Sequence, residues 1–246
     1  MELDDRPTGR VLTRREVLAV LGVSGASLLV GCRAAPGSAR PSSAAAAIPG
    51  CVVRPEQTLG PYFVDEGLER ADIRPDPSTG KVSTGAPLEL AFVVSRVSDS
   101  GCAPLSGARV EVWQCDAEGV YSDVKDPQFD TTGRKFLRGH QLTDADGKAR
   151  FTTIYPGWYR GRTVHIHFKI YGEPAAGRGY EFASQIYFDD EMTDTVHATA
   201  PYTARGARTT RNADDEIYRR GGRELTVPVA ASGEGYTATF EIGLQV

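Results

Sequence analysis

The sequence predicts an all-β protein: a single-domain antiparallel β-sandwich with long functional loops. After about residue 86, short β-rich runs, several with apolar/polar alternation, follow one another. Turn signals such as Asp144-Ala145-Asp146-Gly147 and Pro156-Gly157 separate them, and no stretch predicts an amphipathic helix of more than a few turns. Several short strands with close turns and few helices favour two packed sheets. A chain of 246 residues, 40% of them hydrophobic, is long enough to bury a full core.

Residues 1–32 predict an export signal with a lipidation box. Thr13-Arg14-Arg15-Glu16-Val17-Leu18 is a twin-arginine pattern, and the apolar run from Val17 to Gly31 is too short for a confident membrane span. The run ends in Leu29-Val30-Gly31-Cys32, which is typical of the box whose cysteine becomes acylated. We expect export by the twin-arginine route and an extracytoplasmic protein anchored to a membrane through Cys32. A Sec-type signal, or an uncleaved anchor with an incidental cysteine, is the alternative.

Residues 33–50 are small and Pro-bearing with almost no large apolar side chains, which predicts a flexible tether before a domain at 51–246. The formal net charge of −4 gives nucleic-acid binding no electrostatic support. Three cysteines follow the tether: Cys51, Cys102 and Cys115. In an oxidising compartment we expect one disulfide and one remaining thiol, and all three pairings stay open.

Eight strands are expected within the domain. They lie near residues 88–96, 108–115, 136–143, 148–155, 163–171, 180–188, 224–231 and 235–245. The section before the first strand is charge-rich and loop-like. Residues 189–223 form a long polar excursion that we expect to hold a short helix and, like many long loops in compact domains, to carry function.

The strand expected at 163–171 carries the strongest functional signal. Apolar residues at 164, 166, 168 and 170 alternate with His165 and His167, so both imidazoles project from one face. Two residue rises separate them, about 7 Å, which is the reach of two ligands on one metal ion. Two ordinary surface histidines are the alternative, although the chain has only four His in all.

Tyrosines are the nearby residues that could complete a metal site. Tyr159 lies six positions before His165, where a turn can fold it back over the strand face, and Tyr121 directly follows a β-rich run. The nearest carboxylates sit in turns, such as Asp144 and Asp146. A phenol with a pKa of about 10 becomes a phenolate when a trivalent cation stabilises its charge. Two phenolates and two imidazoles suit Fe(III), a harder acid than Zn²⁺ or Cu²⁺.

Several motifs together resemble those of one known family. They are Val112-Trp113-Gln114 running to Gly119-Val120-Tyr121-Ser122, Thr143-Asp144 with Gly147, Pro156-Gly157-Trp158-Tyr159, Arg162 with His165-Ile166-His167-Phe168, and Gly60-Pro61-Tyr62. From roughly residue 51 to the carboxyl terminus the chain resembles the intradiol ring-cleavage dioxygenases, the catechol and protocatechuate 3,4-dioxygenase family of non-haem ferric enzymes.

The resemblance implies a non-haem Fe(III) cofactor and a set of site residues. The family's arginine falls on Arg162 and its glutamine on Gln185; a solvated arginine and a polar residue on a sheet face are the alternatives. Tyr159 takes the place of the ligand that the family releases when substrate binds. Tyr62 and Trp158, in matching motifs, are candidates for substrate contact. The four implied iron ligands are Tyr121, Tyr159, His165 and His167.

Arg162 poses a geometric problem, because it lies three residues before His165. In an ideal strand it would project from the opposite face. To reach the metal site, the backbone at Arg162 must depart from strand geometry, which Gly161 would permit.

The implied activity is O₂-dependent cleavage of a catechol-type ring between its two hydroxylated carbons, giving a muconate-type diacid. The alternative is a lipid-anchored β-sandwich binding protein that holds iron or an aromatic ligand without turnover. Arg162 and Gln185 favour the enzyme, because a passive metal binder needs neither.

The chain departs from catechol and protocatechuate dioxygenases in its short connection from Tyr159 to His165 and in lacking a helical amino-terminal dimerisation region. The particular catechol and the oligomeric state therefore stay open. Export points to substrates met outside the cell, such as plant- or lignin-derived catechols.

Overall fold

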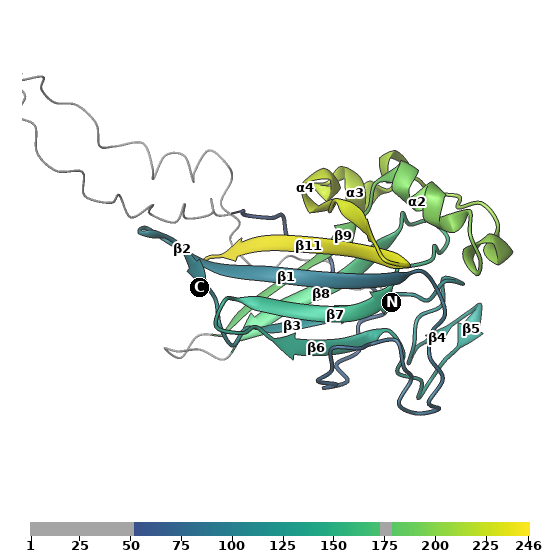
Figure 1. Cartoon of the computed structure of the whole chain (residues 1–246), viewed down its shortest axis with the longest axis horizontal. Helices are drawn as coiled ribbons and strands as arrows, with labels where there is room; N and C mark the ends of the chain where they lie inside the picture. The colour runs from purple at the N-terminus through teal and green to yellow at the C-terminus, as the bar shows by residue number, and fades with distance from the viewer. Residues whose placement is uncertain (1–51, 173–178) are drawn as a thin grey trace, which may run out of the picture.

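The computed structural model describes residues 52–172 and 179–246, in which two β-sheets pack face to face with short helices along one edge (Figure 1). The predicted β-sandwich is confirmed. The twin-arginine pattern, Cys32, the tether and Cys51 lie outside the described residues. Among the helices in the described part of the chain, none combines the length and apolar composition that crossing a bilayer requires.

The first sheet is built around its longest strand, β1. β1 pairs in antiparallel fashion with β7 along its first half and with β2 along its second. Its other edge pairs with β11, which forms a hairpin with β10. The bounds are β1 Pro87–Ser98, β2 Gly101–Pro104, β7 Lys148–Ile154, β10 Val229–Ser232 and β11 Gly235–Leu244.

The β1–β11 pair is parallel, an exception to the antiparallel pairing that the sequence predicts. The hairpin with β10, which closes between Ser232 and Gly235, sets the direction of β11. Apolar/polar alternation has the same period in both orientations, so the sequence pattern carries no sign of this direction.

The second sheet has the order β6-β3-β8-β9 and is antiparallel throughout. A separate two-stranded hairpin, β4–β5, lies beside it. The bounds are β3 Arg109–Trp113, β4 Lys125–Asp126, β5 Phe129–Asp130, β6 Arg138–Leu142, β8 His165–Gly172 and β9 Tyr180–Tyr187.

Aromatic rings lock the two sheets together. Phe92 of β1 contacts Phe151, Phe168 and Phe240, with ring centroids 6.0, 5.4 and 5.7 Å apart. All four side chains are fully buried. Because Phe168 faces this core, alternation along β8 sends His167 to the opposite face of the sheet.

The register of the second sheet places four side chains in one row on that opposite face. Trp113 pairs with Arg138 on one side and with His167 on the other, and His167 pairs with Gln185. Directly paired residues project to the same face. The row therefore gathers residues from all four strands, and His165 follows in the next row.

The excursion at 189–223 contains the helical part of the domain, as expected. The α2 helix starts at Asp190 because the Asp189 carboxylate accepts hydrogen bonds from two amides of its first turn, Glu191 N and Met192 N. Short helical turns follow along the edge of the sandwich (Figure 1). The bounds are α2 Asp190–His197, η1 Tyr202–Arg205, η2 Asn212–Asp214, α3 Glu216–Arg219 and α4 Gly222–Leu225.

The strand expected at 224–231 is partly wrong. Residues 222–225 form α4, which ends in fully buried Leu225, and β10 starts only at Val229. A short apolar run does not distinguish a buried helical turn from a strand. β2, β4 and β5 were not expected, because they are short and β2 contains Gly101 and Pro104, which disfavour strands.

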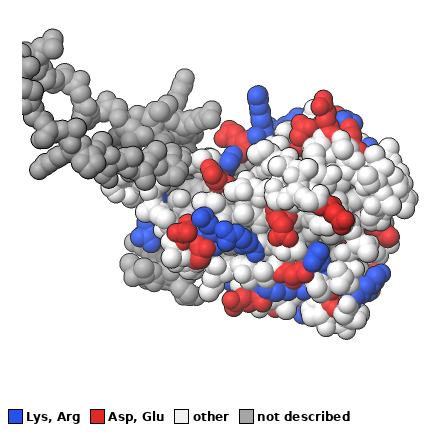
Figure 2. Space-filling model, in the orientation of Figure 1, with Lys and Arg blue, Asp and Glu red and all other residues white. Residues whose placement is uncertain are grey.

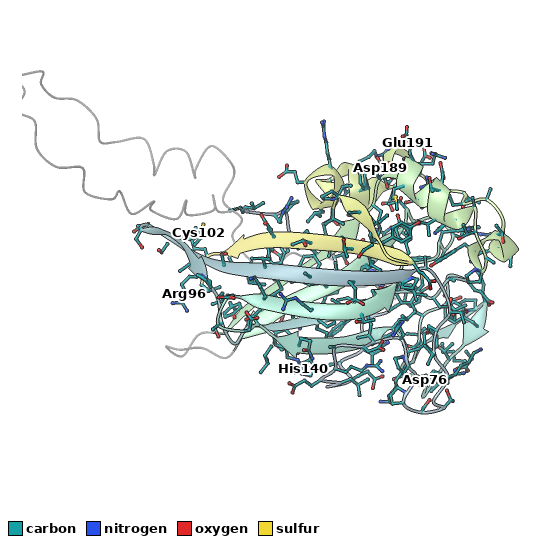
Figure 3. The ribbon with its side chains drawn as sticks, in the orientation of Figure 1. Asp76, Arg96, Cys102, His140, Asp189 and Glu191 are labelled. Atoms are coloured by element: carbon teal, nitrogen blue, oxygen red, sulfur yellow. The ribbon has the colours of Figure 1, made fainter. Side chains whose placement is uncertain are left out.

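One disulfide and one remaining thiol were expected from the cysteines. Cys102, on β2 at one end of the first sheet (Figure 3), is disulfide-bonded. Within the described residues, Cys115 is a free thiol; it is buried, and burial raises its pKa above the usual value. The sequence's other cysteines, Cys32 and Cys51, lie outside the described residues.

Charges of both signs are intermixed on the face shown in Figure 2. Partly exposed ion pairs include Arg74–Asp72, 2.8 Å apart, and Lys169–Glu181, 3.1 Å apart. Such exposed pairs typically contribute about 0–1 kcal/mol each. Packing of the aromatic core therefore contributes more to holding the sandwich together.

The packing around Phe92 predicts how much stability is lost when its ring is removed. Phe92→Ala removes the ring that three others contact and should lower the free energy of unfolding by about 3–5 kcal/mol, measured by urea denaturation. Val82→Ala is the control, because Val82 is 48% exposed and should change stability by less than about 0.5 kcal/mol. Equal effects of the two substitutions would show that Phe92 is not central to the core.

Candidate functional site

The structure brings together the four residues predicted to bind metal: Tyr121, Tyr159, His165 and His167. The ring centroids of the two tyrosines are 5.6 Å apart, and those of the two histidines 4.6 Å. Tyr159 lies 5.6 Å from His165, and Tyr121 lies 6.2 Å from His167. Tyr121, His165 and His167 are buried, whereas Tyr159 is half-buried.

The two imidazoles point their Nε2 atoms at each other across 3.0 Å. His165 Nδ1 donates to Thr163 O at 2.7 Å, which leaves the lone pair of this ring on Nε2. His167 stacks on Trp113 with centroids 5.1 Å apart and planes 5° apart. Burial lowers the pKa of both histidines well below the usual value. Both are therefore neutral, the form that binds a metal ion.

Gly60 closes over the His167 ring. A Cβ built at Gly60 would lie 2.9 Å from His167 Cε1, and the backbone there has φ of +72°. A side chain at this position would displace the imidazole. The Gly60-Pro61-Tyr62 motif thus has a steric role at the site.

The phenol of Tyr121 is buried, and its oxygen has no hydrogen-bond partner among the described residues. Burial raises its pKa well above the usual value, and raises the pKa of Tyr159 to about 12, with Arg162 opposing both shifts. A buried hydroxyl without a partner costs about 1–3 kcal/mol. A cation between the rings would satisfy this oxygen as a phenolate.

The donor set fits a metal ion with mixed nitrogen and oxygen ligands. In the described ranges, no three side chains from among His, Cys, Asp and Glu come together as a metal site. The groups beside the histidine pair are the two phenols. Two neutral imidazoles and two potential phenolates suit a hard or borderline cation.

Arg162 reaches the cluster, as its expected departure from strand geometry requires. Gly161 has φ of +84°, and β8 begins only after Arg162. The guanidinium then lies with Nη1 3.4 Å from Tyr159 Oη. Nε donates to Asp215 Oδ2 at 2.8 Å, and Nη2 donates to Gln185 Oε1 at 2.6 Å.

Gln185 is fully buried and ties Arg162 to its surroundings. Its Oε1 also accepts from Tyr187 Oη at 3.0 Å, and its Nε2 donates to Thr58 O at 3.1 Å. Tyr187 Oη shares the same proton with Gln57 Oε1, 2.7 Å away. Both polar atoms of the Gln185 side chain therefore have hydrogen-bond partners, which fix its orientation.

The two candidates for substrate contact differ. The Tyr62 ring stacks on Tyr121 at 4.5 Å, and its hydroxyl donates to Asp126 at 2.8 Å. The Trp158 side chain instead donates from Nε1 to Gly206 O at 3.2 Å, and the Arg205 guanidinium lies 4.7 Å from its ring. The structure therefore brings Tyr62 into the cluster but directs Trp158 towards the helical excursion.

Asp215 and Thr163 were missed by sequence reasoning. Asp215 is 1% exposed and lies 53 positions after Arg162, the residue that it binds. Its place before Glu216-Ile217 is typical of a helix cap, which is the only signal that it offered. Thr163 was predicted only as part of a strand.

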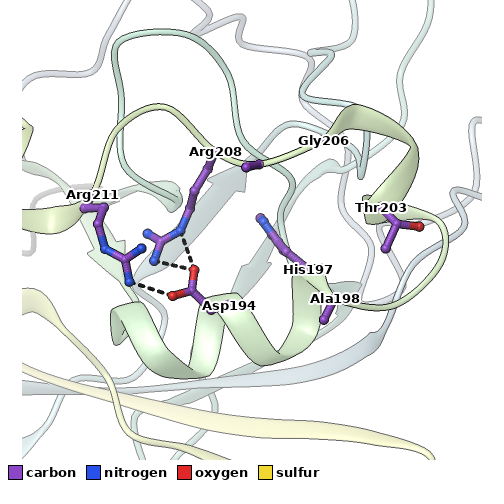
Figure 4. A pocket seen from close by; sticks show the side chains of 8 residues that line it. Asp194, His197, Ala198, Thr203, Gly206, Arg208 and Arg211 are labelled. Carbon is purple, nitrogen blue, oxygen red and sulfur yellow. Dashed lines mark hydrogen bonds and ion pairs between the residues drawn. The ribbon is translucent and has the colours of Figure 1, made fainter.

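A pocket of about 350 Å³ lies beside α2 (Figure 4). Its Asp194 carboxylate accepts hydrogen bonds from Arg208 at 2.9 Å and from Arg211 at 2.5 Å. Asp190 also pairs with both arginines, so two carboxylates balance two guanidinium groups, and these charges give no basis for selecting a charged ligand. The lining residues are Asp194, His197, Ala198, Thr203, Gly206, Ala207, Arg208 and Arg211, none of which belongs to the histidine–tyrosine cluster.

Comparison with known proteins agrees with the geometry of the cluster. A family model described as "Dioxygenase" matches residues 58–217, which include every predicted site residue. The protocatechuate 3,4-dioxygenase beta chain of Burkholderia cepacia is 34% identical over 142 residues, 53% of this chain. The match spans 59% of that relative's length.

Two solved structures are similar over most of the described residues. An intradiol ring-cleavage dioxygenase from Tetranychus urticae is 28% identical with a TM-score of 0.67, over 79% of this chain and 95% of that one. The dioxygenase domain of a dioxygenase–carbohydrate-binding protein fusion from Streptomyces sp. SirexAA-E is 30% identical with a TM-score of 0.55, over 79% and 99%. Since the family model also covers more than half of the sequence, the chain belongs to the intradiol ring-cleavage dioxygenase family.

Proposed function

We propose that this protein is a non-haem Fe(III) enzyme that uses O₂ to cleave a catechol-type ring between its hydroxylated carbons, giving a muconate-type diacid. One observation carries the proposal: two neutral imidazoles and two phenols converge, and a guanidinium lies 3.4 Å from one phenol oxygen. Relatives named as protocatechuate and catechol dioxygenases support it.

Four residues would hold the iron: Tyr121, Tyr159, His165 and His167. Bound there, Fe(III) supplies a Lewis acid that lowers the pKa of a catechol and draws electron density from its ring. Hydrogen bonding of His165 to Thr163 O and stacking of His167 on Trp113 fix both imidazoles before any ligand arrives. The orphaned hydroxyl of Tyr121 gives that ring its role as an anionic ligand.

Tyr159 would also act as a base. Its side chain is more exposed than that of Tyr121, and its Oη lies beside Arg162 Nη1. As a phenolate, its Oη would take a hydroxyl proton from the catechol. Its neutral form has a pKa raised to about 12 by burial, so it retains that proton at neutral pH.

Arg162 would stabilise negative charge that develops on the ring once the catechol has given a proton to Tyr159. Its side chain is only 13% exposed, so little water screens its charge. Gln185 holds one side of the guanidinium and so sets where this charge lies. Tyr62 would contact the substrate ring from its stacked position on Tyr121.

A binding protein without turnover is the competing function. It would need the four donors but not a guanidinium held at 3.4 Å from one of them. Oxygen uptake on addition of a catechol to the purified iron-loaded protein separates the two. The enzyme consumes O₂ in proportion to catechol, whereas a binding protein consumes none.

We also propose export by the twin-arginine route and a lipid anchor at Cys32. The support is the sequence of the first 32 residues, with its twin-arginine pattern, short apolar run and lipidation box. Substrates would then be met outside the cytoplasm, where plant- or lignin-derived catechols are available.

Tyr121→Phe should keep the fold and lose iron affinity, together with the visible phenolate-to-Fe(III) absorption, because it deletes one anionic ligand while preserving the ring. Metal analysis and visible spectra measure both. Tyr236→Phe is the matched control, because it removes a phenol from β11 in the other sheet. Full iron content and unchanged colour in Tyr121→Phe would refute the ligand assignment.

Arg162→Ala should leave iron content nearly intact, because Arg162 is not a ligand. Catechol turnover should fall by about 10²-fold or more, the scale for removing one preorganised electrostatic group. Arg150→Ala removes an exposed arginine from β7 and should leave turnover unchanged. Near-normal turnover in iron-loaded Arg162→Ala would show that Arg162 has no catalytic role.

Cys32→Ser should move the protein from the membrane fraction to the soluble fraction without changing its specific activity. A fully acylated terminus stays in the membrane, whereas an unacylated one has nothing to hold it there. Fractionation of expressing cells measures the distribution. A wild-type protein that is already soluble after export would show that there is no lipid anchor.

A further inference from the structure

Asp215 belongs to the helical excursion, yet its carboxylate is 1% exposed and lies against the start of β8. Oδ1 accepts hydrogen bonds from Ile217 N at 2.8 Å and Tyr218 N at 3.1 Å, which caps α3. Oδ2 accepts from Arg162 Nε and Thr163 N, both at 2.8 Å. One oxygen thus serves the helix and the other serves the site.

The contact with Arg162 sets the direction of the guanidinium. Asp215 holds Nε on one side and Gln185 holds Nη2 on the other. Because the guanidinium is planar, fixing two of its nitrogens determines the direction of the third. Here the third is Nη1, which faces Tyr159 Oη.

The contact with Thr163 reaches one of the histidines. The Thr163 N–H donates to Asp215, and the Thr163 carbonyl accepts from His165 Nδ1 at 2.7 Å. The Thr163 hydroxyl donates to Asn212 Oδ1 at 2.6 Å. Residue 163 is therefore held by the 212–215 turn on one side while it orients the imidazole on the other.

We infer that Asp215 is a positioning residue of the active site, which aims the Arg162 guanidinium at Tyr159 and, through Thr163, steadies His165. The inference rests on the proposed function, because it assigns Asp215 to the same reaction. The 189–223 excursion thereby takes part in catalysis, although Asp215 is far from Arg162 in the sequence. The Asp215 carboxylate would act on the reaction through its two neighbours, Arg162 and Thr163.

Asp215→Asn is the variant that isolates this role. Asparagine is as good a helix cap as aspartate, so its carbonyl oxygen can still accept from Ile217 N and Tyr218 N. Its NH₂ group then faces Arg162 Nε and Thr163 N, which are donors without an acceptor. The matched control is Asp189→Asn, the same change at the cap of α2 (Figure 3), where the carboxylate bonds only the first-turn amides.

The proposal predicts that Asp215→Asn lowers kcat by about 10-fold or more, with KM changed by less than about threefold, because the guanidinium acts on charge that develops after binding. Asp189→Asn should leave both parameters unchanged. In an Arg162→Ala background, the further loss from Asp215→Asn should shrink to about threefold or less, because the group that it aims is gone. Wild-type kcat in Asp215→Asn, or an equal loss in both backgrounds, would overturn the proposal.

Thermal unfolding of the wild-type protein, Asp215→Asn, Arg162→Ala and the double variant supplies a readout that needs no turnover. Asp215→Asn should lower Tm by at least about twice as much in the wild-type background as in Arg162→Ala, since the two side chains are directly coupled. Equal lowering would overturn the positioning role. If the wild-type protein consumes no O₂, the proposed function fails, and this unfolding comparison alone decides whether Asp215 holds Arg162.

Discussion

The alternation of residues along β8 is the constraint on which the site depends. Phe168 must enter the aromatic core with Phe92 and Phe240. His165 and His167 are then forced onto the other face, one pleat apart, with their Nε2 atoms 3.0 Å from each other. A slip of one residue in the pairing of β8 would bury the imidazoles in the core and abolish both fold and site.

Hydrogen bonds in the rest of the site offset the free-energy cost of burying its polar groups away from water. Arg162 is satisfied by Asp215 and Gln185, and His165 by Thr163. The Tyr121 hydroxyl, by contrast, has no partner among the described residues, and neither does His167 Nδ1. A metal ion bound between the converging rings would give the Tyr121 oxygen the partner that it lacks.

Local patterns made much of this predictable. The period of two along residues 164–170 gave both the strand and the facing imidazoles, and Gly161 indicated the bend that brings Arg162 back to them. Contacts between distant segments could not be predicted, because nothing near Asp215 in the sequence indicates that it binds Arg162, 53 positions away. The direction of β11 beside β1 and the turn of Trp158 towards Arg205 likewise depend on packing across the fold.

The central claim is that the cluster cleaves the bond between the hydroxylated carbons of a catechol and incorporates both atoms of O₂ into the product. The most direct test gives the iron-loaded protein a panel of catechols under ¹⁸O₂ and identifies the products by mass spectrometry. The account predicts a ring-opened diacid carrying both labelled atoms. A product opened beside the diol, a quinone with an intact ring, or no ring-opened product from any catechol at full iron occupancy would contradict it.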